Sequence, residues 1–210
     1  LSDETLKTRV NALMQRCGFA AKGLFVMDGS KRSAHANAYF TGFGAAKRVV
    51  FFDTLLKQLS PDEIDAVLAH ELGHYKRRHI LKRIGLMFAL SLAGFAALGW
   101  VSSQAWFYSG LGVTPSMDTP NDALALLLFL MVVPLFTFFL SPLMAQLSRK
   151  HEFEADAYAV AHTSGTDLAS ALLKLYKDNA STLTPDPVYA RFYYSHPPAS
   201  ERIARLQPAA

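Results

Sequence analysis

Residues 60–76 read SPDEIDAVLAHELGHYK, and this stretch predicts a helix with a strong start. Ser60 and Glu63 have the spacing of a capping box, and Pro61 suits the first helical position because its missing N–H is not needed there. Acidic residues in the first turn also suit the helix dipole. Apolar residues then recur at helical spacing, namely Ile64, Val67, Leu68 and Leu72.

His70 and His74 lie at positions i and i+4 of this predicted helix, so they share one face and both imidazoles can reach one tetrahedral Zn²⁺. The pattern His-Glu-x-x-His on a helix is typical of zinc peptidases. Glu71 flanks the metal, where its carboxylate can accept a proton as water attacks a carbonyl. The alternative is a helix that carries two surface histidines beside a solvated glutamate.

A catalytic zinc centre needs a third protein ligand and one open position. The candidates in the sequence are His79, His151, Glu152, Glu154 and Asp156. Glu152 and Asp156 are four positions apart, so on a helix one could bind the metal while the other accepts a hydrogen bond from a ligand histidine. His79 is expected to be too close to His74 along the same helix to converge on the metal. A solvated acidic patch is the alternative for residues 152–156.

Composition points to a membrane. The 210 residues are 51% hydrophobic, and the net charge is +4. Basic residues cluster beside long apolar runs rather than forming a stripe, which gives no support for nucleic-acid binding. Cys17 is the only cysteine, so the sequence excludes an internal disulfide and a cysteine-based zinc site.

Two uncharged segments, Ile84 to Tyr108 and Ala123 to Leu147, are long enough to cross a bilayer as helices. We expect them to form a membrane hairpin, with Pro134 and Pro142 kinking the second helix. Basic residues flank the outer ends of the hairpin, whereas the loop of residues 109–122 carries only acidic charges. The positive-inside bias therefore predicts a multi-pass integral membrane protein with its catalytic residues on the cytoplasmic side. Two fully buried helices of a large soluble core are the alternative.

The rest of the chain predicts short elements around this hairpin. Amphipathic or apolar patterns favour helices over residues 2–17, 144–161, 167–179 and 200–206, and strands over 24–27, 38–43 and 48–52. The last two strands are expected to be joined by a turn at residues 42–47. The helix that starts at Ser60 is expected to run unbroken into the first membrane span.

Four motifs, taken in order, resemble the integral-membrane zinc CAAX prenyl endopeptidases (type I CAAX proteases, gluzincins related to HtpX). They are Asn37–Gly44 with Phe52–Leu55, then His70–His74, then Ser148–Asp156, then His196-Pro197-Pro198 with Glu201-Arg202. The resemblance covers nearly the whole chain. Members of this family carry further membrane helices ahead of the catalytic part, and these are absent from residues 1–210. The chain, which starts at Leu1, is therefore expected to be the carboxy-terminal part of a longer protein.

The resemblance implies roles for particular residues. His70, His74 and Glu152 would bind one Zn²⁺ per chain, and Glu71 would be the general base. Asp156 would support a ligand histidine, and His196 would stabilise the oxyanion of the transition state. The strand at Asn37, Ala38 and Tyr39 would hold the substrate by backbone pairing.

We therefore expect one mainly α-helical, membrane-embedded peptidase domain over residues 1–210, with a small β-sheet whose edge strand lies beside the motif helix. The expected activity is zinc-dependent hydrolysis of peptide bonds near the carboxy terminus of prenylated or similar membrane-associated proteins, at a lipid bilayer. One alternative is an HtpX-like protease for quality control of membrane proteins. A non-catalytic membrane scaffold is the other.

Overall fold

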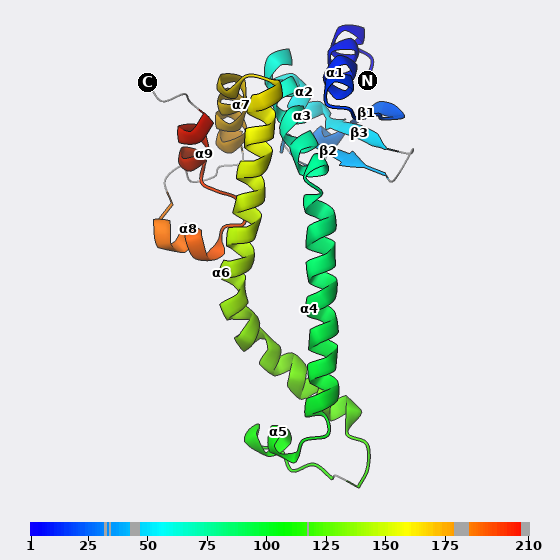
Figure 1. The fold of residues 1–210 in the computed structure, drawn as a ribbon, viewed down its shortest axis with the longest axis vertical. Coiled ribbons are helices and arrows are strands. Elements are labelled where there is room, and N and C mark those ends of the chain that lie inside the picture. The colour runs from blue at the N-terminus through cyan, green and yellow to red at the C-terminus, as the bar shows by residue number, and fades with distance from the viewer. Residues whose placement is uncertain (32, 34, 43–46, 117, 179–184, 207–210) are drawn as a thin grey trace. The chain divides into compact units, whose positions relative to one another are not determined.

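The computed structural model describes residues 1–31, 33, 35–42, 47–116, 118–178 and 185–206. The chain forms two compact units, which consist of residues 1–79 with 145–210 and of residues 80–144. Helices dominate both units, and a three-stranded sheet lies in the first one (Figure 1). The predicted fold class is therefore confirmed.

The first unit contains most of the elements. Its helices are α1 (Glu4–Arg16), α2 (Asp53–Gln58), α3 (Pro61–Lys76), the last part of α6 (Asp122–His162), α7 (Gly165–Asp178), α8 (Pro187–Tyr193) and α9 (Ala199–Leu206). Its strands are β1 (Gly23–Met27), β2 (Ala38–Thr41) and β3 (Arg48–Phe52), with a short 3₁₀ turn η1 at Gly29–Lys31.

The sheet has the order β1-β3-β2, so β2 lies at one edge of the described sheet. β1 runs parallel to β3, and β2 runs antiparallel to it with Tyr39 opposite Val50. The two strands predicted at 38–43 and 48–52 thus pair as expected, although β2 ends at Thr41. Residues 43–46 of the predicted turn lie outside the described residues.

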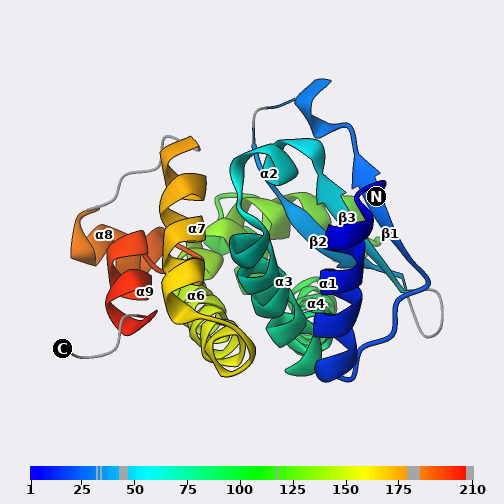
Figure 2. The same ribbon diagram turned by 90° about the horizontal axis from the view of Figure 1, so that it is seen from above.

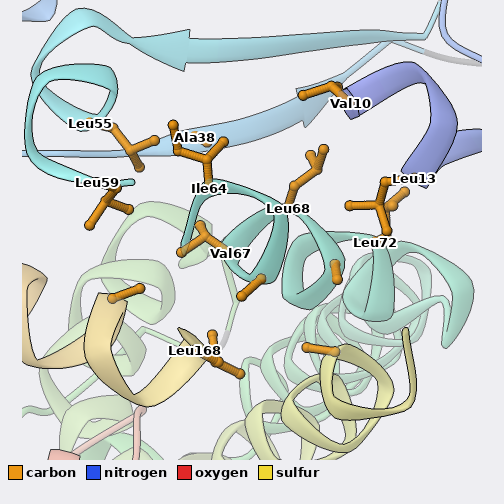
Figure 3. Packing of buried hydrophobic residues seen from close by; sticks show 14 of the residues in the cluster. Val10, Leu13, Ala38, Leu55, Leu59, Ile64, Val67, Leu68, Leu72 and Leu168 are labelled. Carbon is orange, nitrogen blue, oxygen red and sulfur yellow. The ribbon is translucent and has the colours of Figure 1, made fainter. Parts of the chain in front are cut away.

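Helix α3 is the centre of the first unit's core. Ile64 and Leu68 face the sheet side with Ala38 and Leu55, while Val67 faces Leu168 of α7 (Figure 3). Seen from above, α3 has α1 and the sheet on one side and α7 with the end of α6 on the other (Figure 2). Ser60 caps the helix, and both hydrogen bonds of the predicted capping box are present. Because apolar side chains hold α3 from both sides, its polar face has a fixed orientation.

One expectation about this helix is wrong. α3 does not continue into the first apolar helix but ends at Lys76, and α4 (His79–Val101) begins two residues after its C-cap Arg77. The chain turns at Arg78, whose φ of 56° is a left-handed conformation that ends a helix. The basic residues at this break, Arg77 and Arg78, are exposed.

The second unit contains the two apolar segments. α4 and α6 both have the length and hydropathy of membrane-spanning helices, and only 6% and 11% of their apolar windows are buried within the protein. The alternative of two buried core helices therefore has no support in the described residues. α4 begins and ends earlier than the first predicted span, whose last part falls on a turn at residues 102–104 and on α5 (Ala105–Gly110). Phe107 and Tyr108 of α5 form a small core with Val101, Ala125 and Leu128.

α6 is one continuous helix of 41 residues that includes Pro134 and Pro142. Its last part, residues 145–162, contains the helix expected over residues 144–161, which continues the second apolar segment without a break. The acidic residues at 152–156 are therefore on a regular helix, and the i, i+4 argument for Glu152 and Asp156 applies to them.

Candidate metal centre

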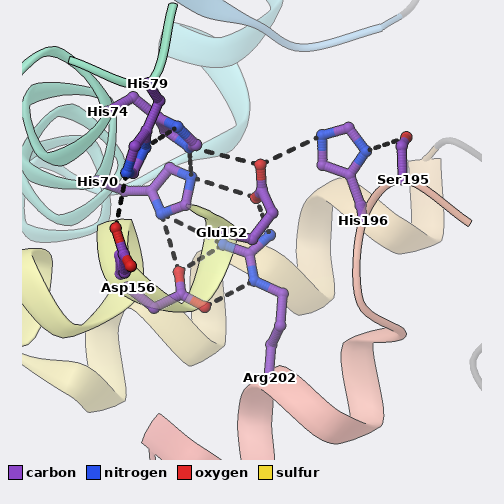
Figure 4. A network of polar contacts seen from close by, with 9 residues as sticks. His70, His74, His79, Glu152, Asp156, Ser195, His196 and Arg202 are labelled. Atoms are coloured by element: carbon purple, nitrogen blue, oxygen red, sulfur yellow. Dashed lines mark hydrogen bonds and ion pairs between the residues drawn. The ribbon is translucent and has the colours of Figure 1, made fainter. Parts of the chain in front are cut away.

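The two motif histidines and Glu152 converge. Nε2 of His74 lies 3.1 Å from Nε2 of His70. The carboxylate oxygens of Glu152 lie 3.5 Å from His70 Nε2 and 3.4 Å from His74 Nε2 (Figure 4). Both His70 and Glu152 are buried, at 8% and 6% exposure, so the cluster is held away from bulk water.

These distances fit a tetrahedral zinc site. Zinc binds imidazole nitrogen and carboxylate oxygen at about 2.0–2.1 Å, so adjacent ligand atoms of a regular tetrahedron lie about 3.3 Å apart. The two imidazole nitrogens lie 3.1 Å apart, and each has a different Glu152 oxygen near this distance, Oε2 at 3.5 Å from His70 and Oε1 at 3.4 Å from His74. Two imidazoles and one carboxylate are also a ligand set that catalytic zinc uses, and they leave a fourth position open. With one donor atom from each residue, the three atoms lie within 4.8 Å of one another, and they fit Zn²⁺ in number and type.

A close helix crossing brings the ligands together. A Cβ added at Gly73 would lie 2.9 Å from the Cα of Ala155 and 3.0 Å from the Cβ of Tyr158, closer than side chains pack. Gly73 therefore lets α3 and the end of α6 approach backbone to backbone. Gly73 stands at one of the unspecified positions of His-Glu-x-x-His, so the motif itself does not reveal this role.

Asp156 holds His70 from behind. Its Oδ1 lies 2.8 Å from Nδ1 of His70, as expected for a carboxylate that orients a metal-binding imidazole. Burial raises the pKa of Asp156, but its hydrogen bonds with His70 and Arg202 outweigh that effect, and the pKa lies below its usual value. A charged Asp156 can only accept, so Nδ1 of His70 donates a proton to it, and in neutral His70 the lone pair is then on Nε2, where a metal can bind.

Arg202 is a part of the site that sequence reasoning missed. Its guanidinium donates from Nε to Asp156 Oδ2 at 2.8 Å and from Nη2 to Asp156 Oδ1 at 2.5 Å, and its Nη1 lies 3.4 Å from Glu152. Arg202 is 5% exposed, so α9 inserts a fixed cation between the two acidic residues. One signal in the sequence pointed to it, since Arg202 belongs to the last of the four motifs.

The surroundings shift the pKa values of the two motif histidines in opposite directions. Burial lowers the pKa of His74, and the neighbouring His70 adds to this, so the pKa is about 4 and the imidazole is neutral near pH 7. Burial also lowers the pKa of His70, but hydrogen bonds with Asp156 and Glu152 outweigh burial and raise the pKa to about 9. A metal that binds here therefore displaces a proton from His70.

Glu71 and Glu152 differ in their environments. Burial raises the pKa of Glu71, and the nearby negative charge of Glu152 raises it further against the opposing effects of His70 and Arg202. A raised pKa suits a residue that must take up a proton near neutral pH. For Glu152, burial raises the pKa, but His70 and Arg202 outweigh burial and bring it to about 2, which keeps this carboxylate ionised.

His196 also lies at the cluster, on the segment between α8 and α9. Its Nε2 is 3.5 Å from Oε1 of Glu152, and its Nδ1 is 3.0 Å from Oγ of Ser195. The side chain is 64% exposed, so it faces the open side of the site. Tyr176 donates from its hydroxyl to the carbonyl of Pro197 at 3.0 Å, which ties this segment to α7.

The other candidate ligands take different places. Glu154 points away from the cluster, and its Oε2 is 2.9 Å from Nε2 of His79. His79 is not a third ligand, but its Nδ1 lies 3.0 Å from Nδ1 of His74. His151 stacks on the ring of His79. Among the described residues, the group of possible metal ligands is His70, His74 and Glu152.

The predicted substrate strand packs against the motif helix. Ala38 of β2 is buried beside Ile64 of α3, whereas Asn37 and Tyr39 are exposed (Figure 3). Phe52 donates its N–H to the carbonyl of Asn37, and by the alternation of an antiparallel pair Tyr39 also faces β3. The backbone groups of Ala38 and Phe40 therefore point to the outer edge of β2.

The helical fold and the donor set of two histidines and one glutamate are those expected of a zinc metallopeptidase, and comparison with known proteins agrees. The sequence profile described as peptidase family M48 matches residues 1–210. CAAX prenyl protease 1 of Saccharomyces cerevisiae is 38% identical over 98% of this chain and 48% of its own length. The CAAX prenyl protease 1 homologue of Homo sapiens is 31% identical over 99% of the chain and 51% of its own length.

A solved structure gives the same result in three dimensions. The crystal structure of S. mikatae Ste24p superposes with a TM-score of 0.87 at 36% identity, covering 99% of this chain and 51% of that one. The chain belongs to peptidase family M48, a family of zinc metallopeptidases. It spans about half the length of the curated relatives that it matches.

Proposed function

We propose that the protein containing this chain is a membrane zinc endopeptidase that hydrolyses peptide bonds near the carboxy terminus of prenylated CAAX-type proteins. The observation that carries the proposal is the triangle of His70, His74 and Glu152, with Glu71 next to the first ligand. The names of the matching relatives support the substrate class.

Each residue has a defined part in this reaction. His70, His74 and Glu152 would hold the metal, Asp156 would fix the ring of His70, and Glu71 would take the proton from the attacking water. Zn²⁺ supplies a Lewis acid that polarises the scissile carbonyl and increases the acidity of water. His196 would donate a hydrogen bond to the oxyanion that develops, an interaction worth several kcal/mol when the donor is held in place.

The edge of β2 is the proposed substrate platform. An extended peptide can add to an exposed strand edge through main-chain hydrogen bonds, with little demand on its sequence. The backbone groups that would pair with it are those of Ala38 and Phe40, because Asn37 and Tyr39 face β3. Side chains at Asn37 and Tyr39 are exposed and can contact the substrate beside that edge.

The two apolar helices support a membrane arrangement. We place α4 and the first part of α6 across the bilayer as a hairpin, because their apolar side chains face outward over most of their length. Lys76, Arg77 and Arg78 precede the hairpin and Arg149 and Lys150 follow it, so the positive-inside bias puts both ends, with residues 1–79 and 145–210, on the cytoplasmic side.

The test is hydrolysis of a farnesylated CAAX peptide by the detergent-purified full-length protein and two variants. Glu71→Gln is expected to bind zinc at the parent's stoichiometry and to lose turnover, because the variant lacks only the base. Glu152→Ala is expected to lose zinc as well, because the variant lacks a ligand. Equal cleavage of unfolded membrane proteins that carry no prenyl group would contradict the prenyl specificity and favour a quality-control protease. Bound zinc without any hydrolysis by the parent would favour the scaffold.

A further inference from the structure

His79 is buried in a chain of polar contacts that the proposed reaction does not use. It is 4% exposed although it lies at the start of a largely exposed helix. Its Nδ1 is 3.0 Å from Nδ1 of His74, and its Nε2 is 2.9 Å from Oε2 of Glu154 (Figure 4). Both ring nitrogens therefore have a partner, and the contacts lead from Glu154 to a motif histidine.

The break between α3 and α4 makes these contacts geometrically possible. In one unbroken helix, His79 would lie five positions after His74 and could not face its ring edge to edge. The left-handed conformation of Arg78 turns the chain, and His79 then packs back against the end of α3. The ring of His79 also lies parallel to that of His151, with centroids 4.1 Å apart and an interplanar angle of 10°. This stacking fixes the plane in which the two nitrogens of His79 point.

Only one arrangement of protons agrees with a metal at Nε2 of His74. A metal-bound nitrogen carries no proton, so a neutral His74 has its proton on Nδ1 and donates it. Nδ1 of His79 must then accept, which places the proton of a neutral His79 on Nε2, where it donates to Glu154. The reverse direction would put a proton on the nitrogen of His74 that faces His70 and Glu152.

We propose that His79 is a positioning residue for the metal: it accepts the Nδ1 proton of His74, and Glu154 holds it in the tautomer that can do so. This inference rests on the proposed role of His74 as a zinc ligand. Both ligand histidines are then held from behind, His70 by the carboxylate of Asp156 and His74 through an intervening imidazole. Partners of this kind fix ring orientation and ligand basicity.

The test measures the affinity of the full-length protein for Zn²⁺ by competition with a chromophoric chelator. His79→Phe keeps a ring that can stack on His151 but has no acceptor, and it is expected to weaken zinc binding about 10–100-fold. His79→Asn keeps an oxygen near the position of Nδ1, and its affinity is expected to lie between those of the parent and His79→Phe. His162→Phe is the matched control on α6, because the ring of His162 bonds to the carbonyl of Tyr158 instead, and it should bind zinc like the parent.

Two further readouts separate positioning from general stability. The visible spectrum of the Co²⁺-loaded protein reports ligand geometry, and it should change in His79→Phe but not in His162→Phe. Glu154→Leu should weaken zinc binding in the same direction as His79→Phe, whereas Lys150→Leu, which removes only the surface cation 3.9 Å from Glu154, should not. Folding of each variant is judged by thermal unfolding of the metal-free protein. If His79→Phe does not fold, the comparison of Glu154→Leu with Lys150→Leu still tests the proposal.

Parental zinc affinity and an unchanged Co²⁺ spectrum in His79→Phe or Glu154→Leu would overturn the proposal. An affinity of His79→Asn as low as that of His79→Phe would overturn the acceptor role of Nδ1. Because these measurements involve no peptide, they test zinc binding separately from the proposed hydrolysis of peptides. A protein that binds zinc as described but cleaves no prenylated peptide would refute that function and leave the role of His79 standing.

Discussion

Gly73 and Ala155 touch through their backbones, since a Cβ on Gly73 would lie only 2.9 Å from the Cα of Ala155 and 3.0 Å from its carbonyl oxygen. This contact sets the distance between α3, which presents His70 and His74, and the part of α6 that presents Glu152. Because this distance between the helices depends on the absence of a side chain at Gly73, adding a methyl group there should change it.

Gly73→Ala is expected to force the two helices apart. Overpacking of this kind costs typically about 1–3 kcal/mol of stability, and the shift would also widen the ligand triangle. We expect both a lower thermal midpoint and weaker zinc binding, measured on the same preparation. Gly85→Ala is the matched control, because a Cβ at Gly85 meets nothing within 4 Å. Zinc affinity equal to the parent's in Gly73→Ala would show that the crossing does not set the ligand spacing.

Arg202→Met is expected to destabilise the site more than any surface arginine would. Without the guanidinium of Arg202, the buried carboxylates of Asp156 and Glu152 have lost this cation. Breaking a buried ion pair costs about 3–5 kcal/mol of stability. Unfolding by denaturant in detergent measures this loss. Arg205→Met on the same helix is the control, because Arg205 lies over the ring of Phe153 and only a small change is expected. A similar loss in both variants would contradict a specific role for Arg202.

If a peptide substrate pairs with the edge of β2, removing a backbone donor there should weaken its binding. Phe40→Pro removes an N–H that points away from β3, and proline is tolerated at such positions of an edge strand. Compared with Phe40→Ala, which also lacks the ring, we expect kcat/KM for a peptide substrate to fall on the order of tenfold, the equivalent of one hydrogen bond. Equal kinetics in the two variants would mean that the substrate does not use this N–H.

Glu63 makes the stability of the fold depend on pH in the acidic range. Burial raises its pKa, but hydrogen bonds with Lys174, Ser170 and the backbone of Ser60 outweigh burial, so the pKa lies below the usual value of 4.5. A carboxylate with a depressed pKa stabilises the fold above its unfolded pKa, and this contribution is lost as pH falls toward the folded pKa. It should therefore be complete at pH 7 and decline below about pH 5.

The measurement compares the thermal midpoints of the parent and Glu63→Gln at pH 7 and at pH 4. The variant should be less stable at pH 7, and the difference should shrink at pH 4, because the parent then loses the charge that the variant lacks. Glu4→Gln is the control, since Glu4 pairs with Lys7 on the surface and should show a small difference at both pH values. A difference for Glu63→Gln that does not depend on pH would refute the argument.

How much the sequence predicted depends on the range of the interactions involved. The capping box and the spacing of His70 and His74 are local, so they could be derived from a few consecutive residues, and the structure has them as expected. Glu152 and Asp156 could be placed on one helix face by their spacing. Spacing alone could not choose between these residues and Glu154, because that choice depends on which helix packs against which face.

The residues that sequence reasoning missed act through contacts between distant segments. Arg202 reaches Asp156 from another helix, and Gly73 matters only because Ala155 lies opposite. The sequence places His79 on a continuation of the motif helix, and the turn at Arg78 makes that expectation wrong, although His79 is not a metal ligand, as expected. No pattern of polar and apolar residues reveals this turn, because the basic run there is compatible with a helix that continues.

His70 and Asp156 are 86 positions apart in the chain, and the apolar hairpin lies between them. During synthesis the two motif histidines therefore leave the ribosome long before their partners. The hairpin must be made, and its second helix must extend back beside α3, before Glu152 and Asp156 can join them. The metal site can therefore form only after these segments have assembled. A chain arrested before α9 would also lack Arg202, the cation that keeps the carboxylates of Glu152 and Asp156 in place.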